Sequence, residues 1–149
     1  MLLDAAIGHL PPITDCIFDN CGDDGIETVN STAGAVLILL GCSFYSCGGN
    51  GINIGTMPAA GLIANCIFSQ SGAYGINNSS GSNSGNIQRI GNLFYSNSSG
   101  TENGFGDTPS LAQQTDSADP YVDAANHDFT PKSTSNAIAN AAPGLFEGP

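Results

Sequence analysis

The chain has 149 residues, enough for one domain, and its 13 acidic residues against two basic ones give a formal charge of −11. A surface this acidic repels phosphate backbones, so we expect no nucleic-acid partner. Hydrophobic residues make up 40% of the chain and charged residues only 10%, which is unlike the composition of a disordered protein.

Residues 1–12 are expected to form an N-terminal cap or a partial coil. Leu2, Leu3 and Ile7 fit either one turn of a capping helix or the end of a coil that starts further upstream. Pro11-Pro12 stops both arrangements. No secretion signal is visible, because the segment lacks a basic start and carries Asp4 within its apolar run. No segment reaches the roughly 18 apolar residues of a membrane span.

Residues 13–106 repeat one sequence motif: Cys, one residue, Phe, two residues, Cys, three residues and Gly-Ile. Three copies begin at Cys16, Cys42 and Cys66. A looser fourth copy begins at Asn92 and has three extra residues before its candidate Gly-Ile equivalent, residues 104–105. The starting residues 16, 42, 66 and 92 are 26, 24 and 26 positions apart. This period is typical of one coil of a β-solenoid.

Alternation along each Cys-x-Phe strand places Cys and Phe on the same face of the strand. Since Phe recurs in all four copies, this face should be the interior. We therefore predict an all-β fold, a parallel β-solenoid of about four coils, in which the glycine before each Ile leaves no room for a Cβ atom. The predicted core comprises Cys16, Phe18, Cys42, Phe44, Cys66, Phe68 and Phe94.

The five cysteines are expected to be free and poorly reactive. Repeat-equivalent residues stack roughly 4.8 Å apart in a solenoid, and parallel Cβ vectors are badly aimed for a disulfide. The Cys-x4-Cys spacing within each copy lacks the closer pairs that zinc sites use.

Residues 107–149 break the repeat and should form an irregular C-terminal cap and tail. Residues 110–115 suit a loop or one helical turn, and residues 119–123 and 127–131 suit two short extended pieces. Residues 135–139 suit a final strand or helical turn.

The repeated motif resembles that of the right-handed parallel β-helix proteins of the pectin-lyase-like superfamily. The resemblance covers residues 13–105. Residues 119–129, which read Asp-Pro-Tyr-Val-Asp-Ala-Ala-Asn-His-Asp-Phe, are similar to the closing segment of secreted and phage-associated members. The resemblance as a whole implies a short or truncated member of that kind, because enzymes of the family generally have about twice as many coils.

Candidate catalytic residues are few. Asp23-Asp24 resembles the paired carboxylates of pectin-hydrolysing β-helices, but the stacked positions in the next copies are Gly49-Asn50 and Ala73-Tyr74. We expect Asp23 and Asp24 to form a solvated turn. Arg89 is the only basic residue of the repeat and the counterpart of the lyase base, and it too is expected to be a solvated side chain.

We expect no cofactor. Two acidic sets, Asp19, Asp23 and Asp24 or Asp116, Asp119 and Asp123, leave Ca²⁺ open as an alternative, although neither has the spacing of a known calcium loop. His9 and His127 lie outside any catalytic spacing and are expected to be ordinary surface residues.

The sequence favours a non-catalytic structural or adhesive β-solenoid on an extracellular or virion surface, which self-assembles or binds glycans. The alternative is a divergent or fragmentary polysaccharide lyase or glycoside hydrolase. Open ends and a small core favour a homo-oligomer or an end-to-end stack, with Leu2, Leu3 and Ile7 buried in the contact.

Overall fold

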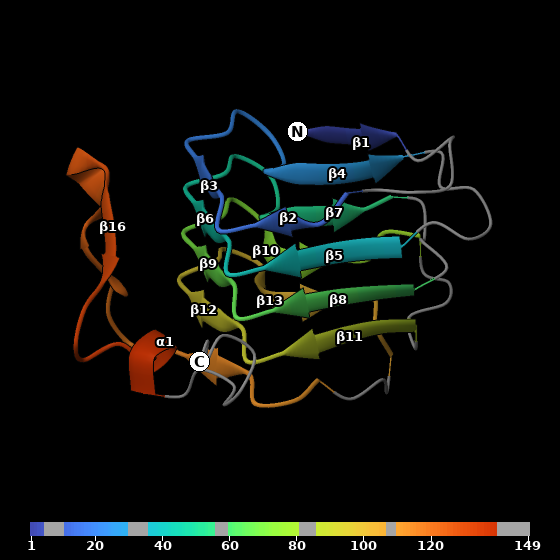
Figure 1. Cartoon of the computed structure of the whole chain (residues 1–149). Helices are drawn as coiled ribbons and strands as arrows, with labels where there is room; N and C mark the ends of the chain where they lie inside the picture. The colour runs from blue at the N-terminus through green and yellow to red at the C-terminus, as the bar shows by residue number, and fades with distance from the viewer. Residues whose placement is uncertain (5–10, 30–35, 56–59, 81–85, 107–109, 140–149) are drawn as a thin grey trace.

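The computed structural model describes residues 1–4, 11–29, 36–55, 60–80, 86–106 and 110–139. Three parallel sheets, here named A, B and C, surround one core (Figure 1). Sheet A contains β1 (Leu2–Asp4), β4 (Ile26–Val29), β7 (Ile52–Ile54), β10 (Tyr74–Asn77) and β13 (Gly100–Asn103). Sheet B contains β2 (Ile13–Thr14), β5 (Val36–Leu40), β8 (Ala60–Ala64) and β11 (Ile87–Ile90). Sheet C contains β3 (Ile17–Asp19), β6 (Ser43–Tyr45), β9 (Ile67–Ser69), β12 (Leu93–Tyr95) and β14 (Gln114–Thr115).

Each strand pairs with the equivalent strand of the next sequence copy. In sheet C, for example, the order is β14-β12-β9-β6-β3, and Phe18 lies opposite Phe44, which lies opposite Phe68. All pairs described among the strands from β1 to β14 are parallel. The predicted all-β class and the stacking at the repeat period are therefore confirmed.

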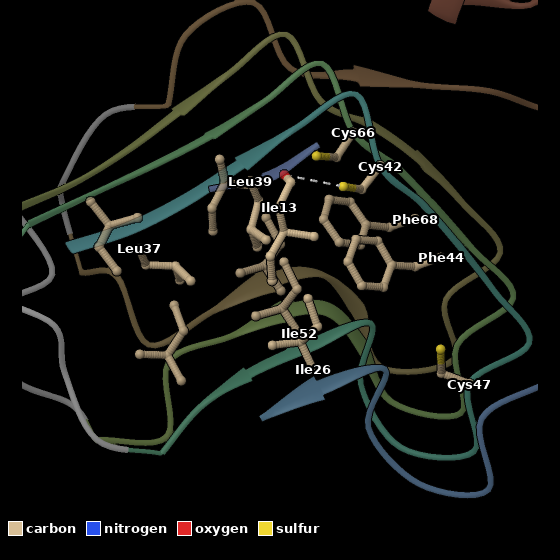
Figure 2. Packing of buried hydrophobic residues seen from close by; sticks show 14 of the residues in the cluster. Ile13, Ile26, Leu37, Leu39, Cys42, Phe44, Cys47, Ile52, Cys66 and Phe68 are labelled. Atoms are coloured by element: carbon tan, nitrogen blue, oxygen red, sulfur yellow. Dashed lines mark hydrogen bonds between the residues drawn. The ribbon is translucent and has the colours of Figure 1, made fainter. Parts of the chain in front are cut away.

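The core is built from columns of identical or similar side chains. The Phe rings stack nearly parallel, with centroid separations of 4.7, 4.8 and 5.3 Å from Phe18 to Phe94. Ile26, Ile52 and Ile76 form a second buried column opposite the strands of sheet B (Figure 2). Burial of each large apolar side chain in these columns contributes about 2 kcal/mol, so the columns supply much of the folding free energy.

Two bends in every coil use a left-handed backbone. Between sheets B and C the bend residues are Asp15, Gly41, Asn65 and Gly91, with φ between 51° and 62°. Their backbone N–H groups each donate to the carbonyl of a residue in the following coil, as from Asn65 to Ile90 at 3.0 Å. Asn, Asp and Gly tolerate this conformation better than other residues, which explains why polar residues recur at the bend.

The first coil is less buried than predicted. Because β3 is the edge strand of sheet C, Cys16 is exposed and Phe18 is only half-buried, so the prediction that Cys16 lies in the core is wrong. Residues 2–4 form β1, which pairs with β4 as part of a coil rather than a helix. The side chains of Leu2 and Leu3, and all of Ile7, lie outside the described residues.

The fourth coil also differs from the predicted alignment of the four sequence copies. The strand register of sheet A pairs Glu102 with Ile76. Thr101-Glu102 therefore takes the Gly-Ile position of the motif, which the predicted alignment assigns to Gly104-Phe105. The segment 110–115 is neither a loop nor a helical turn: Leu111 bridges to Ile90, and β14 pairs with β12. It continues two of the three sheets, so part of a fifth coil covers the end of the core.

The C-terminal strap comprises β15 (Tyr121–Asp123), η2 (Ala124–Asn126), β16 (Asp128–Pro131) and α1 (Asn136–Ala139). Strands β15 and β16 lie within the two predicted extended pieces, which are confirmed, and they form an antiparallel pair. The strap packs on the outer face of sheet C, and Figure 1 shows β16 on that side of the stack. Tyr121 and Phe129 of the strap meet Tyr45 edge-on. His127 Nδ1 lies 2.6 Å from Asp19 Oδ2, and this hydrogen bond connects the strap to the first coil.

The thiols differ in access. All five cysteines are free; Cys42, Cys47 and Cys66 are buried, and Cys21 is half-buried. Burial raises the pKa of Cys47 to about 12 and raises the pKa of Cys66 well above its usual value. A hydrogen bond with Cys66 lowers the pKa of Cys42 to about 7, but no part of Cys42 is exposed, so a reagent cannot reach it.

We expect one thiol to react rapidly with a disulfide reagent in the native protein and the others to react slowly or only after denaturation, because Cys16 alone is exposed. The fast phase should vanish in Cys16→Ser. Uniformly slow reaction of all five thiols, or a fast phase that survives in this variant, would contradict the assigned edge of sheet C.

Candidate functional site

The carboxylate pair Asp23-Asp24 forms part of the framework. Asp24 Oδ1 accepts hydrogen bonds from the backbone N–H of Asn50 at 2.6 Å and from its Nδ2 at 2.9 Å. Asn50 Oδ1 then accepts from the backbone N–H of Tyr74 at 3.1 Å. Asp23 is exposed and Asp24 is half-buried. The turn is solvated on one side, as predicted, and Asp24 holds the next coil in place on the other.

Arg89 is not solvated, and that expectation is wrong. Its side chain is 1% exposed, and its Nε donates to Glu102 Oε2 at 3.0 Å. The guanidinium also donates to the carbonyl of Ile87 and lies 3.9 Å from the centroid of the Phe105 ring. A buried guanidinium that lies over an aromatic ring and is paired with a carboxylate cannot abstract a substrate proton from this position.

The ion pair lies where two apolar core columns end. Along sheet B, Ile13, Leu39 and Ile63 are followed by Arg89. Along sheet A, the column of isoleucines ending at Ile76 is followed by Glu102. Both columns therefore turn from hydrophobic to charged in the same coil, and the two charges neutralise each other inside the protein.

Further polar groups complete this layer. Gln113 Nε2 donates to Glu102 Oε1 at 3.1 Å, and Gln113 Oε1 accepts from the backbone N–H of Asn92 at 3.0 Å. Asn92 occupies, in the next coil, the position equivalent to Cys66. Its Oδ1 accepts a hydrogen bond from the backbone N–H of Cys66 at 3.0 Å. Burial raises the pKa of the Glu102 carboxyl, and the neighbouring Arg89 opposes that shift. The arrangement closes the core with hydrogen-bonded polar groups.

Most of the aspartates considered for Ca²⁺ make hydrogen bonds with protein groups. Asp19 contacts His127, and Asp116 accepts from Ser135 Oγ at 2.8 Å and from Asn136 Nδ2 at 2.7 Å. Asp119 accepts from the backbone N–H of Tyr121 at 3.0 Å. Among the described residues, no group of three or more His, Cys, Asp or Glu side chains is arranged to hold a metal ion.

A groove of about 330 Å³ lies between the strap and the bend that joins sheets B and C. The bend residues Asp15, Gly41, Asn65 and Gly91 line it on one side, and Phe129, Pro131 and Ala137 line it on the other. Exposed Cys16 and Ile17 lie at its first-coil end. Sequence reasoning missed this groove, because it depends on where the strap folds back.

Small residues keep the groove open. In the outward column of sheet C, Ile17, Ile67 and Leu93 are aliphatic, but the second coil has Ser43. Gly41 stands beside Ser43 at the bend of the same coil. A gap in an otherwise aliphatic column was the only sign of the groove in the sequence.

Comparison of the chain with family models, with curated proteins and with solved structures gave no match. Within the described part of the chain, no helix is long and apolar enough to cross a membrane.

We expect Arg89→Met to destabilise the fold by about 3–5 kcal/mol in urea unfolding at pH 7, because Glu102 is left buried without its partner. The double variant Arg89→Ile/Glu102→Ile extends both apolar columns and should recover most of this loss. A single variant that costs less than about 1 kcal/mol would show that the pair is not buried.

The free energy of unfolding of the same variant should depend on pH. A carboxyl whose folded pKa is raised contributes stability below its unfolded pKa, and this is lost as pH rises through the folded pKa. Arg89→Met should therefore be more stable at pH 5 than at pH 8, relative to the wild type.

Proposed function

We propose that this chain is a short right-handed parallel β-helix, related to the pectin-lyase-like proteins, that serves as a non-catalytic structural and glycan-binding module on an extracellular or virion surface. The handedness and the family rest on the resemblance of the repeated motif. The stacked parallel sheets are compatible with both.

The observation that carries the proposal is the burial of Arg89. In the enzyme alternative this residue would act as the base, yet its guanidinium closes the core together with Glu102. Asp24 is a second candidate catalytic residue, and its carboxylate accepts a hydrogen bond from the backbone of the next coil. Two of the three candidate catalytic residues, Arg89 and Asp24, thus serve the framework, which favours a scaffold over an enzyme.

Assembly of several copies remains part of the proposal. Strands β2 and β3 are the edge strands of sheets B and C, and Ile17 on β3 is 55% exposed. Exposed strand edges next to an apolar surface favour association. Whether Leu2, Leu3 and Ile7 take part stays a prediction.

The purified chain should release no reducing ends and no unsaturated sugar from a panel of neutral and acidic polysaccharides, with or without Ca²⁺. In affinity electrophoresis at least one neutral polysaccharide should retard it, while a denatured sample should not be retarded. Saturable product formation that Asp24→Asn abolishes would favour the hydrolase or lyase instead.

A further inference from the structure

We infer that the groove between the strap and the bend of sheets B and C binds a segment of neutral glycan. This inference rests on the glycan-binding part of the proposed function and gives that binding a site. Phe129 and Pro131 of β16, which lies on the outside of the stack in Figure 1, line the groove, and neither Arg89 nor Glu102 is among its lining residues.

The size of the groove limits the ligand. A volume of about 330 Å³ is at the lower end of the range for small-molecule sites. It has room for about one or two sugar rings, and for no folded partner. Its floor is made of bend peptides whose N–H groups already bond to the next coil, as from Gly41 to Ala64 at 3.1 Å. Side chains must therefore supply most of the recognition.

The chemistry of the walls matches a hexose. A hexose presents C–H groups on its faces and hydroxyl groups around its edge. Phe129 and Pro131 line one wall and suit the faces, and Asp15, which is exposed, lines the opposite side and suits hydroxyl groups. An apolar wall with a few placed polar groups is the usual composition of a small-ligand site.

Charge selects a neutral glycan over an acidic one. The protein carries a formal charge of −11, and Asp15 adds a carboxylate at the groove itself. Both basic side chains are used elsewhere: Arg89 is buried, and Lys132 Nζ donates to the carbonyl of Asp119 at 2.9 Å. A uronic or sulfated sugar would meet repulsion here without a compensating cation.

Cys16 supplies a reporter of occupancy, because it is the exposed thiol and it lines the groove. The rate of its modification by a disulfide reagent would be measured in the wild-type chain with cellotriose, mannotriose, chitotriose or trigalacturonate. At least one neutral trisaccharide should slow the reaction several-fold in a saturable manner, and trigalacturonate should not. Calorimetry would measure the affinity of the protecting sugar.

Two Asp-to-Asn variants separate the groove from the overall charge. Asp15→Asn keeps a residue that tolerates the left-handed bend and removes the carboxylate, so binding should weaken about tenfold. Asp23→Asn makes the same change in charge at an exposed position outside the groove lining, and affinity should stay unchanged. Equal effects of the two variants would overturn the inference.

Blocking the groove chemically tests most directly whether the groove is the binding site. Modification of Cys16 with N-ethylmaleimide should abolish trisaccharide binding, and the Cys16→Ser variant treated in the same way should still bind. Binding that survives the modification would overturn the groove as the site and leave the proposed glycan-binding function standing. If calorimetry and protection both detect no neutral trisaccharide, the groove inference fails; cleavage of a sugar would instead contradict the non-catalytic function.

Discussion

The structure depends on the seating of one aromatic ring per coil against a glycine of the preceding coil. A Cβ atom added to Gly51 would lie 2.6 Å from Cδ1 of Phe68, and one added to Gly75 would lie 2.6 Å from Cδ1 of Phe94. Neither glycine has a positive φ, so the requirement is for space and not for backbone freedom. The motif that joins Phe to Gly-Ile in the sequence is thus one packing constraint between successive coils.

The end of the stack supports this account. In the fourth coil the position of Gly75 is taken by Thr101, and in the partial fifth coil the position of Phe94 is taken by Thr115. Where no ring follows, no glycine is needed. The inward columns that contain Ile76 and Ile63 change to Glu102 and Arg89 in the fourth coil, one coil before the Phe column ends at Thr115. All three columns therefore stop within the last two coils.

Much of the fold could be predicted from the sequence, because stacking turns a period into contacts. The Phe column follows from spacing and alternation. Three features could not be predicted. Exposure of Cys16 reflects its place on an edge strand, the register of Glu102 depends on where the extra residues of the fourth copy loop out, and the groove needs the strap. The burial of Arg89 had a signal, since it occupies the position of Ile63 in an apolar run.

The ring-on-glycine constraint is tested most directly by a double-mutant cycle between Gly75 and Phe94, with urea unfolding as the readout. We expect Gly75→Ala to cost about 2 kcal/mol or more in the wild type and clearly less when Phe94→Val has removed the two ring atoms, at 2.6 and 2.7 Å, that its Cβ would meet. The backbone oxygen of Thr101, 2.9 Å from the same Cβ, is present in both backgrounds and accounts for the part of the cost that should remain. Gly22→Ala, where a Cβ meets nothing within 4 Å, serves as the matched control. Additive effects of Gly75→Ala and Phe94→Val would contradict the account.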